Sequence, residues 1–350
     1  MIPEFFTHQD EWLDQVGRIY AALQSVEVGE AGTGHRVALR RKNRINSIHS
    51  STAIEGNRLS LDQVTAVING HTVYGPERDI LEVQNAWTAY EALETYDPFS
   101  VDDFLRAHGL LTSGLIAESG HFRSRDVEIV NQRGEVLHTG SQVAKVPRLV
   151  SEMLQWASAT KLHPLIGSSA THYLIEHIHP FQDGNGRIGR LWQTLMLSRW
   201  NALFAWMPTE TLIARHQPDY YTALQASHDP EIDAAPFITF MLGMIEASLR
   251  NYQISHQDSH QVSHQDSRQV ELGTHGVTIL ALLAAGPASR AKLLEGIGLK
   301  NETRSARRNL APLIEQGLIE MTNPDNPQAR TQQYRLTQFG ADILARGANW

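Results

Sequence analysis

Apolar residues recur with the spacing of an amphipathic helix through most of the first 100 residues. Residues 77–93 predict one such helix, because five large apolar side chains fall on one side of it: Ile80, Val83, Trp87, Tyr90 and Leu93. Ser60 and Gln63 have the spacing of a capping box, which predicts a short helix that runs to Val67 and stops near residue 70. Residues 102–117 predict another helix.

The pattern changes from helix to strand near residue 127. Val127, Ile129 and Val130 are followed by a polar turn over 131–134 and then by Val136 and Leu137, which predicts a β-hairpin. Helical spacing resumes afterwards, over residues 147–156, 166–178 and 188–200. The main body of the chain is therefore expected to be mainly α-helical, with one hairpin.

Residues 255–270 are a near duplication of a polar segment, Ser-His-Gln-Asp-Ser-His-Gln-Val and then Ser-His-Gln-Asp-Ser-Arg-Gln-Val. The pattern offers no apolar face large enough for a core, and we interpret it as a polar linker. The alternative is a metal site, because His256, His260 and His264 would align on one face of a helix.

The segment after this repeat has the element order of a winged helix, which is a helix-turn-helix variant. Helices are predicted over residues 277–285, 289–296 and 302–316, and a two-stranded wing over 318–321 and 333–336. We therefore expect an N-terminal helical region over 1–100, a core over 101–250, a linker over 251–271 and a winged-helix domain over 272–350.

The composition fits a globular protein and adds a charge asymmetry. The chain has 350 residues, 41% of them hydrophobic, and a net charge of −8, which argues against wholesale coating by nucleic acid. Residues 271–350 contain nine Lys or Arg and seven Asp or Glu, so they are less acidic than the rest. No cysteine is present, which excludes disulfides and thiolate chemistry. The longest apolar run, 277–285, is too short for a membrane span, and the first residues do not resemble a signal peptide. A cytoplasmic protein without membrane contact is expected.

The segment His179-Pro-Phe-Gln-Asp-Gly-Asn-Gly-Arg-Ile-Gly-Arg190 concentrates groups that suit a polyphosphate. His179 can accept a proton near neutral pH, and Asp183 is a hard oxygen ligand suited to Mg²⁺. The backbone N–H groups of Gly184, Asn185 and Gly186 can approach an anion closely at a helix N-terminus. Each of these features alone would more often be structural. Together they predict a site for a nucleotide.

Two arginines complete this segment. Arg187 and Arg190 are three residues apart, so they share one face of the predicted helix. Each guanidinium can bind phosphate oxygens through two parallel hydrogen bonds. These positions add fixed positive charge to the predicted anion site.

The segment resembles the signature of the Fic (Fido) family, His-x-Phe-x-Asp/Glu-Gly-Asn-Gly-Arg-x-x-Arg, at every defined position. Most members of that family move AMP from ATP onto a Tyr, Ser or Thr hydroxyl of a protein. The resemblance implies that His179 is the general base and that Asp183 holds Mg²⁺. It also implies that Gly184, Asn185 and Gly186 cradle the α/β-phosphates, that Arg187 binds the inner phosphates and Arg190 the γ-phosphate, and that Phe181 packs in the core.

The resemblance to the family covers about residues 35–250, and a second matching segment lies upstream of the first. Ser51-Ser-Thr-Ala-Ile-Glu55-Gly56 is similar to the family's inhibitory pattern, Ser/Thr-x-x-x-Glu-Gly/Asn. Ser51 and Glu55 would share one face of an inhibitory helix over about 44–56. The resemblance implies that Glu55 pairs with Arg190 and blocks the γ-phosphate. The alternative is a solvated glutamate at a helix end.

The resemblance extends to three further features. The hairpin at 127–137 corresponds to the family's docking site for a protein target, although it could also merely cover the core. Tyr220 and Tyr221 resemble the segment near the adenine site, with core packing as the alternative reading. Arg304, Arg307 and Arg308 fall on the expected recognition helix of the winged domain, and Lys300 precedes it, so DNA, a protein partner and a homodimer are all open as partners.

We therefore expect a mainly α-helical Fic-type core with a hairpin flap and a C-terminal winged helix. The leading hypothesis is an autoinhibited protein adenylyltransferase that uses ATP and Mg²⁺, with a hydroxyl of its own as one acceptor. The first alternative is removal of AMP from a modified protein, with Glu55 aligning a water. The second alternative is a DNA-binding regulator that senses a nucleotide.

Overall fold

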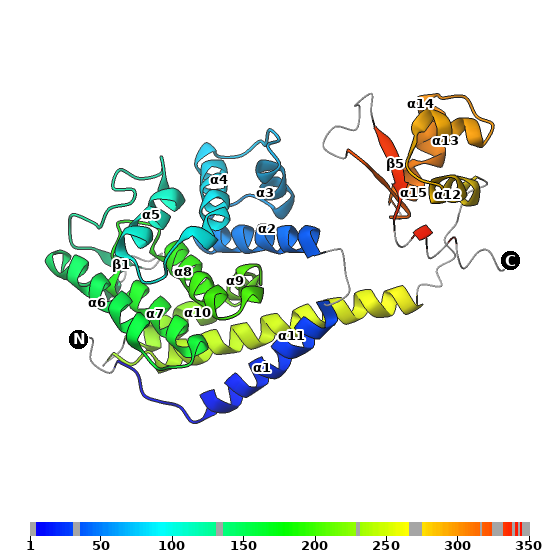
Figure 1. Cartoon of the computed structure of the whole chain (residues 1–350). Helices are drawn as coiled ribbons and strands as arrows, with labels where there is room; N and C mark the ends of the chain where they lie inside the picture. Colours follow the sequence, from blue (N-terminus) through cyan, green and yellow to red (C-terminus); the bar gives the residue numbers. More distant parts are fainter. Residues whose placement is uncertain are drawn as a thin grey trace. The chain divides into compact units, whose positions relative to one another are not determined.

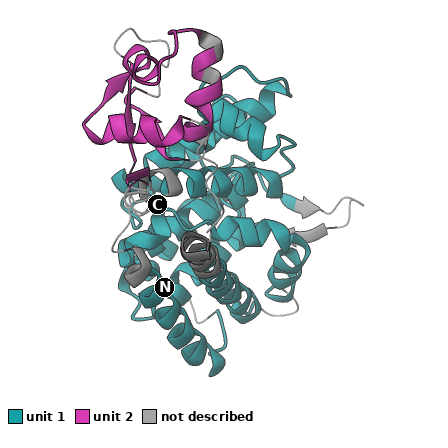
Figure 2. Ribbon diagram, turned by 90° about the vertical axis from the view of Figure 1, so that its right-hand side faces the viewer, with its two compact units in different colours: residues 1–259 teal, residues 260–350 magenta. Residues whose placement is uncertain are grey.

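The structure is a computed structural model that describes residues 5–30, 36–130, 136–228, 232–265, 275–315, 317–323, 332–337, 340–341 and 344. The chain forms two compact units, residues 1–259 and residues 260–350, which are shown in separate colours in Figure 2. The boundary falls inside the duplicated segment 255–270.

The first unit is built from helices and one hairpin (Figure 1). Its N-terminal helices are α1 (Glu11–Glu30), α2 (Arg36–Ile54), α3 (Leu61–Ile68), α4 (Glu77–Glu91) and α5 (Val101–Thr112). The hairpin strands are β1 (Glu128–Val130) and β2 (Val136–Thr139). The later helices are α6 (Val146–Ala159), α7 (Pro164–Ile178), α8 (Asn185–Trp200), α9 (Thr209–Arg215), α10 (Gln217–Ala226) and α11 (Ala235–Gln265).

Helices α7 and α8 form the centre of this unit, and the predicted active-site segment joins them. A helix that is apolar on most of its sides is expected to be surrounded by others. Accordingly, α7 buries Tyr173, Ile175 and Ile178, and α8 buries Leu191 and Trp192. Burying a large apolar side chain contributes about 1.5–3 kcal/mol to the stability of the fold. This well-packed helix pair therefore supports the loop that joins its two helices.

Helices α1 and α11 lie side by side along one edge of the first unit (Figure 1). The indole Nε1–H of Trp12 donates to Thr239 Oγ1 at 2.8 Å, and Arg18 Nε lies 2.8 Å from Glu246 Oε1.

The interpretation of residues 255–270 as a linker changes in one respect, because α11 continues to Gln265. Residues 266–274 and the side chains of His256, His260 and His264 lie outside the described part of the structure.

The second unit has the element order of a winged helix. Helices α12 (Gly276–Ala284), α13 (Arg290–Gly296), α14 (Thr303–Asn309) and α15 (Ala311–Glu315) accompany an antiparallel sheet in the order β3-β5-β4. Its strands are β3 (Ala288–Ser289), β4 (Ile319–Met321) and β5 (Gln333–Leu336). A separate apolar cluster that includes Leu280, Leu293 and Leu318 forms its core.

Most of the predicted elements are present, and two helices differ from the pattern: one ends early and one is divided. Ser60 and Gln63 form both hydrogen bonds of the capping box. The helix expected over 102–117 stops at Thr112, before Gly114 at φ +70°. The helix expected over 302–316 is two helices, because Pro312 has no N–H and its ring crowds the carbonyl four residues earlier.

The hairpin is confirmed as two antiparallel strands. Glu128 pairs with Thr139 and Ile129 with His138, and the register shifts before Val130 pairs with Val136. The turn 131–135 and the side chains of 129–138 lie outside the described part of the structure. The hairpin base is near the active-site segment, because Ser141 N–H donates to Ile178 O at 3.2 Å.

Candidate active site

His179 ends helix α7 in a left-handed backbone conformation. Its φ is +51°, the only positive value at a non-glycine position in the described ranges. Such a conformation is costly for a residue with a β-carbon and is typical of functional sites. His179 Nδ1 lies 3.3 Å from the carbonyl oxygen of Glu176. Since a carbonyl only accepts, this contact puts the proton on Nδ1 and leaves Nε2 as the basic nitrogen.

The side chain of Asn185 holds the loop after His179 through hydrogen bonds to its backbone. Asn185 Oδ1 accepts from Phe181 N–H at 3.0 Å, and its Nδ2 donates to Phe181 O at 2.9 Å. Phe181 is fully buried, as expected. Gly184 at φ +87° is the N-cap of α8, so the first N–H groups of this helix face the site. Asn185 thus shapes the cradle with its side chain, while the backbone offers the anion contacts.

His108 supports the same loop, which the sequence did not indicate. Its ring stacks on Phe181 with centroids 3.5 Å apart and an angle of 5°. Nε2–H donates to Asp183 O at 2.9 Å, and Nδ1 accepts from Gly120 N–H at 3.1 Å. Burial lowers the pKa of His108 to about 4, so the imidazole is neutral and matches both partners.

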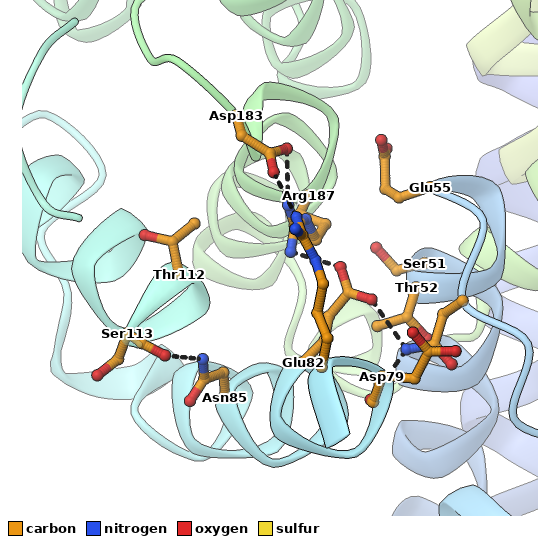
Figure 3. Close-up of polar contacts among 12 residues, drawn as sticks. Ser51, Thr52, Glu55, Asp79, Glu82, Asn85, Thr112, Ser113, Asp183 and Arg187 are labelled. Carbon is orange, nitrogen blue, oxygen red and sulfur yellow. Dashed lines mark hydrogen bonds and ion pairs between the residues drawn. The ribbon is translucent and has the colours of Figure 1, made fainter. Parts of the chain in front are cut away.

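Arg187 is buried between two carboxylates (Figure 3). Its Nη1 donates to Glu82 Oε1 at 2.5 Å, and its Nη2 donates to Asp183 Oδ1 at 2.9 Å. Glu82 also accepts from Asn57 Nδ2 at 2.8 Å, just past the end of α2. Burial raises the pKa of Glu82, and the charge of Arg187 offsets part of this effect. Neither Glu82 nor Asn57 was predicted, because an isolated polar residue gives no local sign of a distant partner.

Asp183 is the most accessible carboxylate around Arg187. Its side chain is 37% exposed, against 12% for that of Glu82. Its second oxygen lies 3.2 Å from Nη2 of Arg78, which is itself largely exposed. A half-exposed carboxylate beside a phosphate cradle suits a cation that also binds phosphate oxygens. No cluster of three metal-ligating side chains occurs among the residues that the structure describes.

Arg190 is fully buried and points at the end of α2. Its Nη2 lies 2.7 Å from Glu55 Oε1 and donates to Ser51 O at 3.0 Å, and its Nε donates to Ser51 Oγ at 3.0 Å. Although burial alone would lower the pKa of Arg190, the charge of Glu55 raises it, so the guanidinium stays charged. Nη1 has no hydrogen-bond partner among the described residues.

The Glu55 carboxylate lies against the first turn of α8. A β-carbon built on Gly186 would overlap Glu55 Oε1 and come within 2.9 Å of Arg190 Nη1. The carboxylate is therefore located where the N-terminus of α8 would receive an anion. Gln217 Nε2 donates to Ile54 O at 2.7 Å, which holds the end of α2 in this place.

The two tyrosines separate into one buried and one accessible ring. Tyr220 is 1% exposed, and its hydroxyl donates to Glu176 Oε1 at 3.0 Å. Its ring contacts Phe237 and has no exposed face to offer to an adenine. Tyr221 is 44% exposed, so it is the tyrosine of this pair that can stack on a base.

The fold therefore brings together Ser51, Glu55 and all the predicted residues of the 179–190 segment. Comparisons with known proteins identify the family. Residues 98–197 match the model of the Fic/DOC family, and residues 277–337 match that of the C-terminal domain of the Filamentation induced by cAMP protein Fic-like family. A crystal structure of a Fic family protein from Desulfovibrio desulfuricans G20 is 39% identical, with a TM-score of 0.68. The match covers 96% of this chain and 99% of that chain. The chain belongs to the Fic family.

Curated Fic relatives carry the name protein adenylyltransferase. Protein adenylyltransferase Fic from Nematostella vectensis is 26% identical over 264 residues, which is 73% of this chain and 58% of the relative. Protein adenylyltransferase fic-1 from Caenorhabditis elegans is 29% identical over 238 residues, covering 62% of this chain and 43% of the relative. The chain thus spans about half the length of the curated Fic relatives it matches.

Proposed function

We propose that this Fic protein transfers AMP from ATP to a protein hydroxyl and that Glu55 holds it in an inhibited state. The observation that carries the proposal is the contact of Arg190 with Glu55 beside Gly186, in the same site as His179. A base, an anion cradle and a competing carboxylate in one site are what a regulated phosphoryl-type transfer requires.

The proton step is assigned to His179. With the proton on Nδ1, the Nε2 lone pair accepts the proton of the acceptor hydroxyl. The hydroxyl oxygen forms a bond to the α-phosphorus while the bond from that phosphorus to the bridging oxygen of pyrophosphate breaks. Pyrophosphate leaves with that oxygen, and the products are the AMP-modified side chain and a protonated His179.

The remaining groups bind the charge of ATP. The backbone N–H groups at the start of α8 and the Arg187 guanidinium suit the inner phosphates, and Arg190 suits the γ-phosphate. Asp183, half exposed at the edge of the cradle, would hold Mg²⁺, which neutralises phosphate charge when bound. Arg187 then exchanges part of its contact with Asp183 for phosphate oxygens.

Inhibition follows from competition for Arg190. A γ-phosphate and the Glu55 carboxylate are both anions that pair with the same guanidinium. Because Glu55 also occupies the space over Gly186, ATP can bind in the productive position only after this carboxylate moves.

Two further features are assigned to binding of the acceptor protein and of the adenine ring of ATP. The β1–β2 hairpin offers backbone edges that an extended target segment can pair with, as in β-strand addition. The exposed ring of Tyr221 is assigned to adenine stacking. In the C-terminal unit, Lys300 and Arg308 are exposed, and the side chains of Arg304 and Arg307 lie outside the described part of the structure. A protein partner, a homodimer and DNA therefore all stay open as partners of its winged helix. No helix in the described part of the chain is both long and apolar enough to cross a bilayer.

Removal of AMP from a modified protein is the second candidate. The observation that favours it is the position of Glu55, whose side chain is 27% exposed beside the cradle and could align a water for attack on a bound AMP-protein. In that reaction Glu55 is required rather than inhibitory.

The test is incorporation of AMP from labelled ATP with Mg²⁺. We expect Glu55→Gly to raise incorporation, and His179→Ala to abolish it in that background. Unchanged labelling by Glu55→Gly refutes autoinhibition. Loss of label from a modified target only when Glu55 is present would instead put the reverse reaction first.

A further inference from the structure

Arg123 is a buried arginine that the reaction above does not use. It precedes the hairpin and lies outside the 179–190 segment, and its side chain has no exposed surface. The nearest carboxylate is that of Asp126, at 3.7 Å and 66% exposed, so no buried counter-charge explains it. A buried charge with such a weak partner is expensive unless its hydrogen bonds are satisfied.

The guanidinium is satisfied by backbone carbonyls from three separate stretches of chain. Nε donates to His179 O at 2.7 Å, Nη1 donates to Arg125 O at 2.7 Å, and Nη2 donates to Ser141 O. The backbone N–H of Arg123 also donates to Pro180 O at 3.0 Å. Arg125 precedes β1 and Ser141 follows β2, so one side chain connects both ends of the hairpin to the active-site loop.

These hydrogen bonds hold the backbone of His179, and the backbone conformation sets the direction of its imidazole ring. His179 adopts φ +51°, which a residue with a β-carbon leaves readily unless its peptide planes are held. Binding of its carbonyl by a charged donor fixes the peptide between His179 and Pro180. The same donor group fixes the hairpin on which the acceptor hydroxyl is proposed to dock.

We propose that Arg123 is a positioning residue that sets the distance between the general base and the hydroxyl docked on the hairpin. The inference rests on the proposed function, because it assigns a role in the same transfer. Arg123 touches neither ATP nor the hydroxyl, and it acts through the backbone of His179, Arg125 and Ser141.

Replacement of Arg123 leaves other contacts that keep the hairpin base attached. Ser141 N–H donates to Ile178 O at 3.2 Å, and Gly140 N–H donates to Val127 O at 3.1 Å. Gly140→Ala is a second variant that keeps the buried charge, because its β-carbon would lie 3.2 Å from Arg123 Nη2 and 3.3 Å from His179 Cβ. Arg125→Lys is the control, since the exposed side chain of Arg125 makes none of these bonds.

The experiment measures AMP transfer in the Glu55→Gly background. We expect Arg123→Lys to lower kcat by about 100-fold, the effect of a misplacement of about 1 Å. The KM for ATP should change less than about threefold, because Arg187 and Arg190 are untouched. Gly140→Ala should lower kcat in the same way, and Arg125→Lys should leave it unchanged. A kcat that is unaffected by both variants, or a loss shared equally by kcat and ATP binding, overturns the proposal.

A second readout does not depend on transfer. The ring resonances of His179, followed by NMR against pH in the resting protein, should shift in Arg123→Lys and not in Arg125→Lys. Unchanged His179 resonances in Arg123→Lys overturn the positioning role. If Glu55→Gly itself transfers no AMP, the proposed function fails, and the resonances still decide whether Arg123 positions His179.

Discussion

Arg190 and Glu55 lie 2.7 Å apart, although 135 residues separate them in the sequence. The contact joins α8 to the end of α2, and Ser51 on α2 adds two hydrogen bonds to the same guanidinium. The charge that would bind a γ-phosphate is therefore already neutralised inside the protein.

Replacement of Ser51 should relieve part of the inhibition. Ser51→Ala removes the hydroxyl that accepts from Arg190 Nε and leaves the bonds to Ser51 O and Glu55. A hydrogen bond to a charged group contributes about 1.5–3 kcal/mol, so AMP incorporation should rise by about tenfold. Ser50→Ala, on the same helix but bonded to Thr211, is the matched control and should stay at the basal rate. Equal rates for the two variants would contradict a role for Ser51.

Gly186 should be needed for ATP binding as well as for inhibition. In the Glu55→Gly background, Gly186→Ala places a methyl group in the space that Glu55 occupied. We expect the KM for ATP to rise by at least about tenfold, the effect of about 1.4 kcal/mol of lost binding. Titration of initial rates with ATP measures this change. An unchanged KM would mean that the phosphates do not enter the space over Gly186.

Glu82 should contribute to stability through Arg187. Glu82→Ala leaves the buried Arg187 with Asp183 as its remaining carboxylate partner, and breaking a buried pair costs about 3–5 kcal/mol. We expect urea unfolding to report a loss toward the lower end of that range, because Asp183 remains. Glu91→Ala breaks the more exposed pair with Arg44 and should cost less than about 1 kcal/mol. Similar losses of stability for both variants would contradict a larger contribution from the buried pair of Glu82 and Arg187.

His108 should make the protein sensitive to acid. Its pKa is lowered to about 4 from 6.5, so between these values the unfolded chain binds a proton at His108 that the folded chain does not. Its contribution is therefore complete above pH 6.5 and is lost as the pH falls toward 4, by about 3 kcal/mol in all. Urea unfolding across this range should show that loss, and His108→Gln should lack it. Parallel pH profiles for the two proteins would exclude His108 as its source.

The sequence predicted the site in the parts that local chemistry controls. The 179–190 segment contains the proposed base, the proposed anion cradle and both arginines, and the structure places all of them in the loop between α7 and α8 and in the start of α8. The capping box at Ser60 and the hairpin strands were predicted correctly for the same reason, because each depends on neighbours only a few residues apart.

Residues that support the site through long-range packing gave no local signal. Glu82, His108 and Arg123 lie 56 to 105 residues before their partners in the sequence, and a lone polar residue in a helix or loop is usually solvated. Tyr220 shows the opposite case. Its sequence context suggested a ligand contact, and packing of α10 against Phe237 put its ring in the core.

By itself, the sequence determined which groups are available for the proposed chemistry, because they are fixed by residue type and spacing over twelve consecutive positions, 179–190. Only the tertiary structure decided which of these groups contacts a competing carboxylate and which is held by a buried arginine. Glu55 reaches Arg190, and Arg123 reaches His179, because the packing of α2 on α8 and of the hairpin base on α7 brings distant segments within hydrogen-bond distance. Such contacts depend on the geometry of the whole core, which no local pattern encodes.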